Sequence, residues 1–233
     1  MAAKEDLQLL GLAVSPFAIR VRIALNLKGV SYENLEQNLM DKSELLLKSN
    51  PVHKKVPVLI HGGKPICESL VILQYVDEVW TAAPSILPAE PYNRAVARFW
   101  AGFVDDKLFP SMVGILKATT EEERAAKVSE TLAAMGKLEE AFAERASGKP
   151  FFGGDSIGYV DLALGSTLIW LEAVRRMFGV AFIDAGETPL LAAWAERFRE
   201  AEAANGELPD ADIAVEFGRT LQARWAAASA AAN

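Results

Sequence analysis

The sequence predicts an α/β domain followed by an all-α domain, and three observations support this division. Strand and helix patterns alternate through the first part of the 233-residue chain, whereas every long segment of the second part has helical periodicity. Between them, residues 82–91 contain three prolines and are typical of a linker. The charge also differs, because residues 1–80 carry nine Lys/Arg and nine Asp/Glu while the remainder carries 15 and 22. We therefore expect domains at 1–81 and 92–233.

The first part alternates between the two periodicities of regular structure. An apolar strand at Leu7–Ala13 precedes a segment, Ile19–Lys28, whose apolar residues have the spacing of an amphipathic helix. The later elements are a strand at 31–36, a short helix at 41–49, a strand at 56–61, a Gly-Gly turn, a return strand at 65–67 and a helix from 68 to 80. The order βαβ, a loose helix, then ββα is that of the thioredoxin-like fold. A generic small α/β unit remains the alternative.

The junction between the first strand and the first helix is the stretch Ser15-Pro16-Phe17-Ala18. Serine is a favourable N-cap, and proline suits the first helical turn. A hydroxyl beside the exposed N–H groups and the positive end of a helix is well placed to hold a negative charge. The junction is therefore the first place to look for a binding site.

The second part predicts a helical bundle. A long helix at 92–117 has Val96, Phe99, Trp100 and Phe103 facing inward, and Pro110 should kink or break it. Thr120 to Glu123 form a capping box that opens the next helix, which runs towards residue 145. Residues 160–178 are apolar almost all round and predict a buried central helix, and two further helices are expected at 189–203 and 213–228.

Composition excludes several classes of function. Apolar residues make up 51% of the chain, but no run is long enough to span a membrane, and Lys4, Glu5 and Asp6 interrupt any secretory signal. The single cysteine, Cys67, rules out an intrachain disulfide, and with two histidines it gives no usual zinc ligand set. A net charge of −7 argues against nucleic acid as a partner. We expect a cytoplasmic protein without a bound metal.

Four separate stretches resemble the tau class of glutathione transferases, the plant-specific branch of that superfamily. They are residues 15–21 (SPFAIRV), 50–59 (NPVHKKVPVL), 68–69 (ES) and 158–161 (GYVD). The resemblance covers nearly the whole chain and implies a thioredoxin-like domain followed by an all-α domain. It further implies a cytosolic homodimer that adds glutathione, a co-substrate, to hydrophobic electrophiles in xenobiotic detoxification, with no other cofactor.

The catalytic prediction concerns Ser15. Redox members of the fold have Cys-x-x-Cys at this helix start, whereas this chain has Ser15 and Ala18, so mixed-disulfide chemistry is lost. A serine hydroxyl can instead donate a hydrogen bond to a thiol brought by the ligand. Lowering a thiol pKa of roughly 8.5 by about two units would leave it mostly ionised at neutral pH. The alternative is that Ser15 only caps the helix.

Glutathione carries two carboxylates, so its site needs cations, a sheet edge and a helix N-terminus. Val56 precedes a proline that resembles the cis-proline of this fold, which leaves the backbone free to pair with a ligand. The Ser69 hydroxyl and nearby N–H groups at a helix start suit the γ-glutamyl carboxylate. The resemblance assigns Glu68 to the α-ammonium, and Lys42 and Lys55 to the glycyl carboxylate. Both lysines could equally be solvated.

The second substrate is expected between the domains, in an apolar pocket that recognises electrophiles without specifying them. Each candidate taken alone is more often a core residue. The candidates are Phe17, Phe109, Met112, Trp170, Phe217, Leu221 and Trp225.

Two other readings of function remain open. A ligandin-like protein would carry hydrophobic or anionic molecules with little catalysis, and glutathione-dependent hydroperoxide reduction would use the same thiolate. Other motifs have structural explanations. Gly158 and Asp161 resemble the capping motif at the central helix of the superfamily. We expect Cys67 to be a buried structural thiol and the pair Asp105-Asp106 to lie on a solvated helix face.

Overall fold

In the computed structural model, which describes residues 6–232, a mixed four-stranded sheet forms the first part of the chain. Strand β1 pairs in parallel with β2 and antiparallel with β3, and β4 pairs antiparallel with β3, which gives the order β2-β1-β3-β4. Gly62 and Gly63, both with positive φ, form the predicted turn between β3 and β4. The strands are β1 (Leu7–Gly11), β2 (Glu33–Glu36), β3 (Val58–His61) and β4 (Lys64–Cys67).

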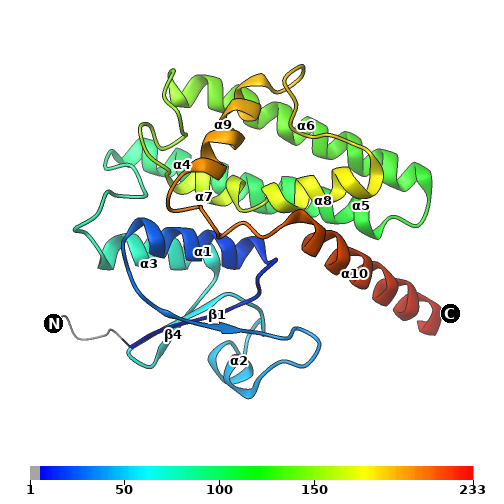
Figure 1. Ribbon diagram of the computed structural model, residues 1–233, viewed down its shortest axis with the longest axis horizontal. Helices are drawn as coiled ribbons and strands as arrows, with labels where there is room; N and C mark the ends of the chain where they lie inside the picture. Colours follow the sequence, from blue (N-terminus) through cyan, green and yellow to red (C-terminus); the bar gives the residue numbers. More distant parts are fainter. Residues whose placement is uncertain (1–5, 233) are drawn as a thin grey trace.

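Helices cover both faces of this sheet. Helices α1 (Pro16–Leu27) and α3 (Ser69–Val79) lie between the sheet and the helical part of the molecule, whereas α2 (Glu44–Ser49) lies on the opposite side (Figure 1). A small apolar core that includes Leu10 and Leu46 joins the sheet to α2. The predicted thioredoxin-like order is therefore confirmed.

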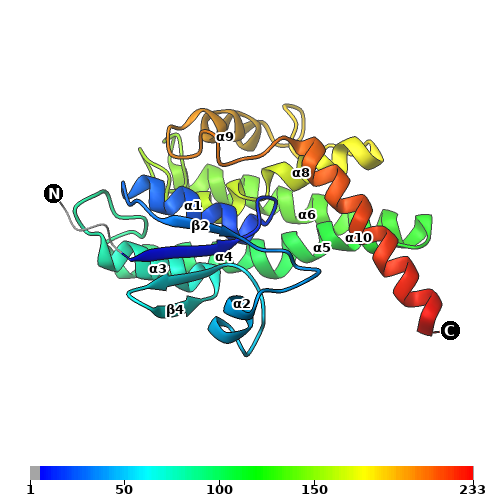
Figure 2. The same cartoon turned by 60° about the horizontal axis from the view of Figure 1, so that its bottom comes forward.

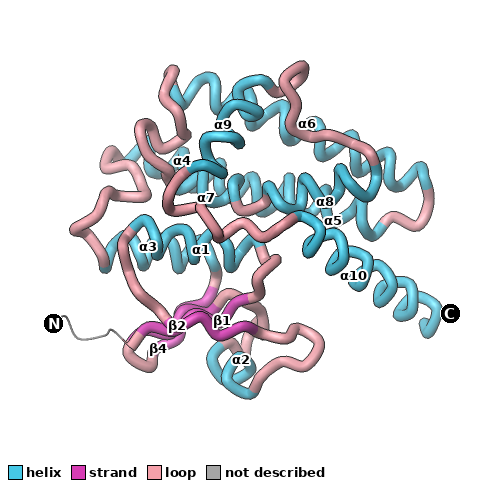
Figure 3. The backbone as a smooth tube through the Cα atoms, viewed as in Figure 1, coloured by secondary structure: helices cyan, strands magenta, loops and turns pink. Residues whose placement is uncertain are grey.

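The rest of the described chain is helical, with all four strands confined to its first part (Figure 3). Residues 80–90, between α3 and α4, contain neither helix nor strand, in the region where we expected the linker. The last helix passes α8 and α5 and then leaves the body of the molecule (Figure 2). The elements are α4 (Pro91–Phe103), η1 (Val104–Leu108, a π-helix), α5 (Phe109–Lys117), α6 (Glu121–Ala146), α7 (Tyr159–Gly165), α8 (Leu168–Phe178), α9 (Pro189–Glu200) and α10 (Ala211–Ala232).

The predicted helix at 92–117 is interrupted next to Pro110 by a π-helical turn, without a break in the helical backbone. Element η1 lies directly before Phe109 and Pro110, and the residues at both of its ends keep right-handed helical φ and ψ. The inward orientation predicted for Phe99 is wrong, because 63% of this side chain is exposed. Val96, Trp100 and Phe103 are half-buried.

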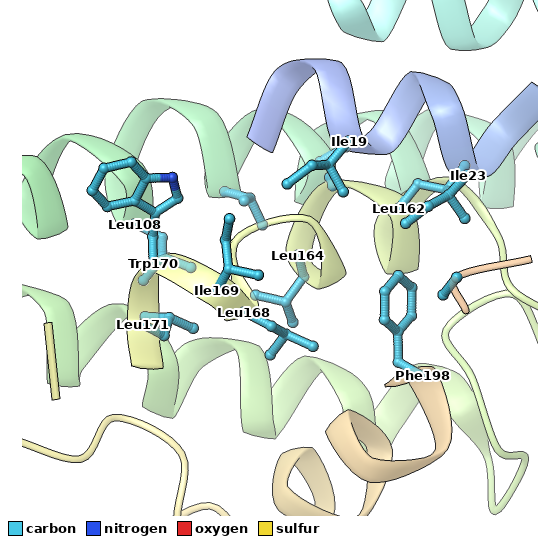
Figure 4. Packing of buried hydrophobic residues seen from close by; sticks show 14 of the residues in the cluster. Ile19, Ile23, Leu108, Leu162, Leu164, Leu168, Ile169, Trp170, Leu171 and Phe198 are labelled. Carbon is cyan, nitrogen blue, oxygen red and sulfur yellow. The ribbon is translucent and has the colours of Figure 1, made fainter. Parts of the chain in front are cut away.

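The predicted central helix at 160–178 is two helices. The hydroxyls of Ser166 and Thr167 donate to the carbonyls of Ala163 and Leu164, at 3.0 and 2.7 Å, and these bonds compete with continuation of the helical ladder. The prediction that this segment is buried holds for α7, every residue of which is buried, and for the start of α8, but it is wrong for the end of α8, where Arg175 and Arg176 are exposed. Figure 4 shows its side chains packed between α1, α8 and α9.

Asp161 organises the start of α7, as the cap motif predicted. Its carboxylate accepts hydrogen bonds from the backbone N–H groups of Phe152, Gly153 and Gly158 and from Nε1 of Trp194, at 2.8–2.9 Å. The side chain is fully buried. This residue therefore joins the loop after α6 to α7 and α9.

The two parts are joined by a partly buried ion pair. Arg20 of α1, which has no exposed surface, donates from both terminal nitrogens to Asp105 of η1, at 2.8 and 2.7 Å. The predicted solvated face is thus wrong for Asp105 and holds for the exposed Asp106. Arg20 also donates a hydrogen bond to Ser69, which is 49 residues away along the chain. Nothing in the sequence indicated that these two residues would be bonded.

Within residues 6–232, no helix is both long and apolar enough to cross a membrane.

Candidate active site

Ser15 lies at the helix junction and borders a cavity of about 480 Å³. Its Oγ accepts a hydrogen bond from the backbone N–H of Ala18, at 3.4 Å, as expected for an N-cap. The hydroxyl therefore acts as an acceptor towards the protein, and because it donates no hydrogen bond within residues 6–232, its own proton is available for a group in the cavity. Serine at this position can cap the helix and donate to a ligand at the same time.

The backbone near Ser15 offers a favourable electrostatic environment for an anion. Helix α1 is 12 residues long, and the N–H groups of its first turn have no carbonyl partner within the helix. Its first residue, Pro16, has no N–H itself. No acidic side chain lies in the first turn of α1. A negative charge beside the Ser15 hydroxyl would interact favourably with the positive end of this helix.

A smaller hollow of about 210 Å³ continues from the cavity along the start of α3. It shares Phe17, Lys55 and Val56 with the cavity. It adds Ser69 and Glu68, which the sequence analysis named, and His53, which it did not. His53 Nε2 lies 3.8 Å from a Glu68 carboxylate oxygen. The hollow therefore contains both cationic and anionic side chains, as a zwitterionic ligand requires.

The loop that borders this hollow is shaped by Asn50. Its side chain accepts from the His53 N–H, at 3.1 Å, and donates to the Lys55 carbonyl, at 3.0 Å. The following Val56-Pro57 peptide is cis, as the motif suggested. Asn50 thus holds the turn that brings Lys55 and Val56 to the edge of the cavity.

The hydrogen bond that the Ser69 hydroxyl makes to the protein determines what it can offer to a ligand in the hollow. Nη1 of the buried Arg20 donates to Ser69 Oγ, at 3.4 Å. The Ser69 hydroxyl is then an acceptor towards Arg20 and a donor towards a ligand. Such a donor at the first residue of an 11-residue helix favours a carboxylate.

Six of the seven predicted pocket residues line the large cavity. Met112 is the exception, because it is fully buried in the core and outside the lining. The six residues are Phe17 and Phe109, which pack edge to face at 4.9 Å between ring centroids, Trp170, Phe217, Leu221 and Trp225.

Several lining residues were missed from the sequence. Val113 and Leu116 follow Phe109 by four and seven residues and Met112 follows it by three, so helical periodicity places all four on one face of α5 and does not separate the lining residues from Met112. Leu12, Val14 and Leu39 come from loops and strand ends, where no periodic signal exists. Lys42 and Lys55 border the same cavity and are exposed, at the end towards the sheet.

Cys67 is half-buried next to Glu68. Its thiol donates to the Ser49 carbonyl, at 3.6 Å, and burial raises the pKa of the thiol above its ordinary value, with Glu68 adding to the effect. These features support the structural interpretation of this residue. Among residues 6–232, no group of three or more His, Cys, Asp or Glu side chains is arranged to hold a metal ion.

Comparison with known proteins identifies the family. Models of the glutathione S-transferase N-terminal and C-terminal domains match residues 5–78 and 121–197. The solved Tau class glutathione S-transferase MiGSTU from mango, Mangifera indica, superposes with a TM-score of 0.91 at 49% identity, covering 94% of this chain and 100% of the mango chain. The chain belongs to the tau class of glutathione transferases.

Other relatives of this tau-class transferase agree with the assignment. It is 55% identical to the probable glutathione S-transferase GSTU6 of Oryza sativa subsp. japonica, over 99% of this chain and 100% of the relative. It is 47% identical to glutathione S-transferase U17 of Arabidopsis thaliana, over 94% and 97%. The structure of rice GST1 (OsGSTU1), solved in complex with glutathione, superposes with a TM-score of 0.87 at 38% identity, over 96% and 99% of the two chains.

Proposed function

We propose that this transferase binds glutathione between the polar hollow and the apolar cavity and stabilises its thiolate with the Ser15 hydroxyl. The thiolate then attacks hydrophobic electrophiles held in the cavity. The observation that carries the proposal concerns Ser15, which lies at the start of α1 and borders an apolar cavity. Its hydroxyl oxygen accepts from the Ala18 N–H, so its proton can be donated to a ligand. The rice relative solved with glutathione supports the choice of ligand.

In this proposal the tripeptide runs along the edge of the sheet. The γ-glutamyl carboxylate accepts from Ser69, the α-ammonium meets Glu68, and the central peptide pairs with the backbone of Val56. Lys42 and Lys55 neutralise the glycyl carboxylate. All five residues border either the hollow or the cavity, which supports a continuous path ending at Ser15.

The reaction needs only that the thiol give up its proton to solvent. The Ser15 hydroxyl and the positive end of α1 stabilise the resulting thiolate. A sulfur lone pair forms the C–S bond, and the displaced electron pair departs with a leaving group such as halide. With an activated alkene, the pair moves to the conjugated carbonyl, and water supplies a proton to the product.

Replacement of Ser15 by alanine tests the assignment. At about pH 6, below the thiol pKa in both proteins, Ser15→Ala should keep glutathione binding within about threefold and reduce conjugation by about 100-fold, because the donor acts on the thiolate rather than on the bound thiol. Calorimetry measures the binding, and turnover with a panel of electrophiles and hydroperoxides measures the activity. Ser69→Ala is the matched control, with weaker binding expected. Wild-type turnover in Ser15→Ala would contradict the assignment.

A carrier role is the second candidate, and the cavity lining favours it. Ser15, Lys42 and Lys55 are the polar residues among those that line the cavity, so an apolar or anionic molecule could bind there without reacting. Tight binding of such ligands, with negligible turnover of every electrophile in the panel, would favour the carrier over the enzyme.

We propose further that the protein is a homodimer, as the resemblance implied. Apolar side chains are exposed on adjacent helices α3 and α4: Val71 is 50% exposed, Tyr92 65% and Phe99 63%. The two helices are joined by a hydrogen bond from Arg98 to Gln74, at 3.0 Å. Such a patch is typical of a subunit interface. Light scattering should give twice the chain mass for the wild type and the monomer mass for Phe99→Asp; a monomeric wild type would contradict the dimer.

A further inference from the structure

The loop that precedes Ser15 is held by side chains from three separate elements. Glu36, at the end of β2, accepts from the Ala13 N–H, at 2.8 Å. Arg22 of α1 donates to the Ala13 carbonyl, at 3.2 Å. Nε1 of Trp170, on α8, donates to the Val14 carbonyl, at 2.7 Å. The peptide groups next to Ser15 are therefore fixed from outside the loop.

The bond from Trp170 is the one that crosses between the two parts of the molecule. Trp170 and Val14 are 156 residues apart, and both are buried, with 6% and 3% of their surface exposed. Figure 4 shows the indole standing beside the N-terminal side of α1. A buried hydrogen bond of this length contributes to stability, and its loss leaves a buried carbonyl without a partner.

The same ring is part of the wall of the cavity. It lies edge to face with Phe217 of α10, at 6.2 Å between centroids, and its lining role was predicted from the sequence. An apolar wall needs only the ring, since phenylalanine would supply a similar surface. The indole N–H has a separate task, because it is bonded to the residue directly before Ser15.

We propose that Trp170 is a positioning residue for Ser15. Its indole N–H holds the Val14 carbonyl and thereby sets the direction in which the Ser15 hydroxyl points into the cavity. The inference rests on the proposed function of Ser15 in thiolate stabilisation. Hydrogen-bond strength falls steeply with misalignment, so a small rotation of the loop weakens the bond to sulfur.

Replacement of the indole by a ring without the N–H separates positioning from wall formation. Trp170→Phe should raise the pKa of the bound glutathione thiol by about 0.5 to one unit, which corresponds to the loss of one net hydrogen bond. Conjugation below that pKa should fall by about three- to tenfold, while KM for glutathione stays within about twofold. Absorbance of the thiolate in the glutathione complex gives the pKa directly.

Trp225→Phe is the matched control. Trp225 lines the same cavity, and its ring contacts Lys117, with Nζ 5.1 Å from the ring centroid. Within the described residues, its indole N–H makes no hydrogen bond to the Ser15 loop. This variant should change KM for the electrophile and leave the thiol pKa at the wild-type value.

A double variant tests whether Trp170 acts through Ser15. In the Ser15→Ala background, Trp170→Phe should cause no further rise in the thiol pKa. An additional rise of the same size would mean that Trp170 acts independently of the hydroxyl, and this would overturn the proposal. If Trp170→Phe does not fold, benzothienylalanine at position 170 keeps the ring shape and removes the N–H.

The failures of the two proposals are distinguishable. An unchanged thiol pKa in Trp170→Phe, with a raised pKa in Ser15→Ala, overturns the positioning role alone. An unchanged pKa in Ser15→Ala overturns the proposed function of Ser15, and the positioning role with it.

Discussion

The Ser15 hydroxyl has one proton to donate, and the direction of that proton decides what the residue can do. Because the Ala18 N–H already donates to Ser15 Oγ, the hydroxyl serves as an acceptor on the protein side. Ser69 is in the same situation, with Arg20 as its donor. Both serines can therefore present a donor to an anionic ligand, one to a thiolate and the other to a carboxylate.

Asp161 is the residue on which the start of α7 depends most. Burial raises the pKa of this carboxyl to about 6, while hydrogen bonds from Gly158, Phe152, Trp194 and Gly153 favour the ionised form. Asp161→Asn turns an amide NH₂ towards these donors. At about pH 8, where the wild-type carboxyl is ionised, the variant should lose about 3 kcal/mol of unfolding free energy.

Denaturant unfolding measures this loss, and Asp155→Asn is the control. The Asp155 side chain is 79% exposed and pairs with Lys149 at the surface. Its replacement should change the free energy of unfolding by less than about 0.5 kcal/mol. Equal effects of the two substitutions would contradict the role of Asp161.

Local motifs predicted some of the residues that border the cavity and the hollow, and not others. Ser15, Ser69 and Val56 were predicted because each belongs to a strand end or helix start whose chemistry can be recognised over a few residues. Arg20, which donates to Ser69, and His53, which borders the hollow, were not predicted, since their partners are brought together by folding. Met112 was also predicted, and it is fully buried and lies outside the cavity lining, because an apolar side chain on a helix gives no sign of whether it faces the core or a cavity.

At the level of the elements, Gly165 determines how closely α7 approaches α9. A Cβ at this position would lie 2.1 Å from the Phe198 ring, which is itself fully buried. Gly165→Ala should therefore destabilise the protein by about 2 to 3 kcal/mol through overpacking. Thermal and denaturant unfolding measure the effect.

The matched control is a glycine in an open position of another helix. A Cβ at Gly136, in α6, meets nothing within 4 Å. Gly136→Ala should stabilise the protein by about 0.5 to 1 kcal/mol, because alanine has the higher helix propensity. Destabilisation by both substitutions would show that packing against Phe198 is not the cause.

The stability of the C-terminal half of α8 depends on pH through Glu172. Hydrogen bonds from Arg175 and Arg176 hold the pKa of this carboxyl at about 2, against the desolvation that raises it. A depressed pKa contributes stability that is present above the unfolded pKa and is lost as the pH falls towards the folded pKa. The contribution should therefore decline from about pH 4.5 downwards.

Comparison with Glu172→Gln isolates this contribution. The variant should be less stable than the wild type at about pH 6. The difference should narrow as the pH falls to about 3, because the carboxyl of the unfolded wild-type chain then takes up its proton while the folded one, with a pKa of about 2, stays mostly ionised. Urea unfolding at a series of pH values gives the difference. A difference that stays constant, or widens on acidification, would contradict the assignment of the low pKa to Glu172.

The existence and order of the elements were predictable, whereas their internal breaks were not. Apolar periodicity is continuous through residues 160–178, so it gave no sign of the break that the Ser166 and Thr167 hydroxyls stabilise. Pro110 predicted an interruption but not its π-helical form, since this depends on packing around η1. Phe99 is exposed, although large aromatic side chains are usually buried. The proposed contact with a second subunit would explain this exposure.

At the scale of the whole molecule, an ion pair connects the polar hollow, where we propose that glutathione binds, to the helical part. Arg20 contacts Ser69 on one side and Asp105 on the other, so the position of η1 bears on the orientation of the Ser69 hydroxyl. Asp105→Asn leaves the buried guanidinium without its charge partner. We expect a loss of about 2 to 4 kcal/mol in unfolding free energy, together with weaker glutathione binding.

The neighbouring carboxylate provides the control for this prediction. Asp106 is exposed and makes no ion pair within residues 6–232. Asp106→Asn should leave both the stability and the glutathione affinity close to wild-type values, as measured by denaturant unfolding and calorimetry. Similar losses in the two variants would show that general charge reduction, not the bond to Arg20, is responsible.

The most direct test of the account is a pH titration of the thiol of glutathione bound to the protein, followed by the ultraviolet absorbance of the thiolate. In the wild type we predict a pKa about two units below the free value of roughly 8.5, and in Ser15→Ala a pKa that returns most of the way to it. The same pKa in both proteins would contradict the account, because the Ser15 hydroxyl would then have no part in stabilising the thiolate.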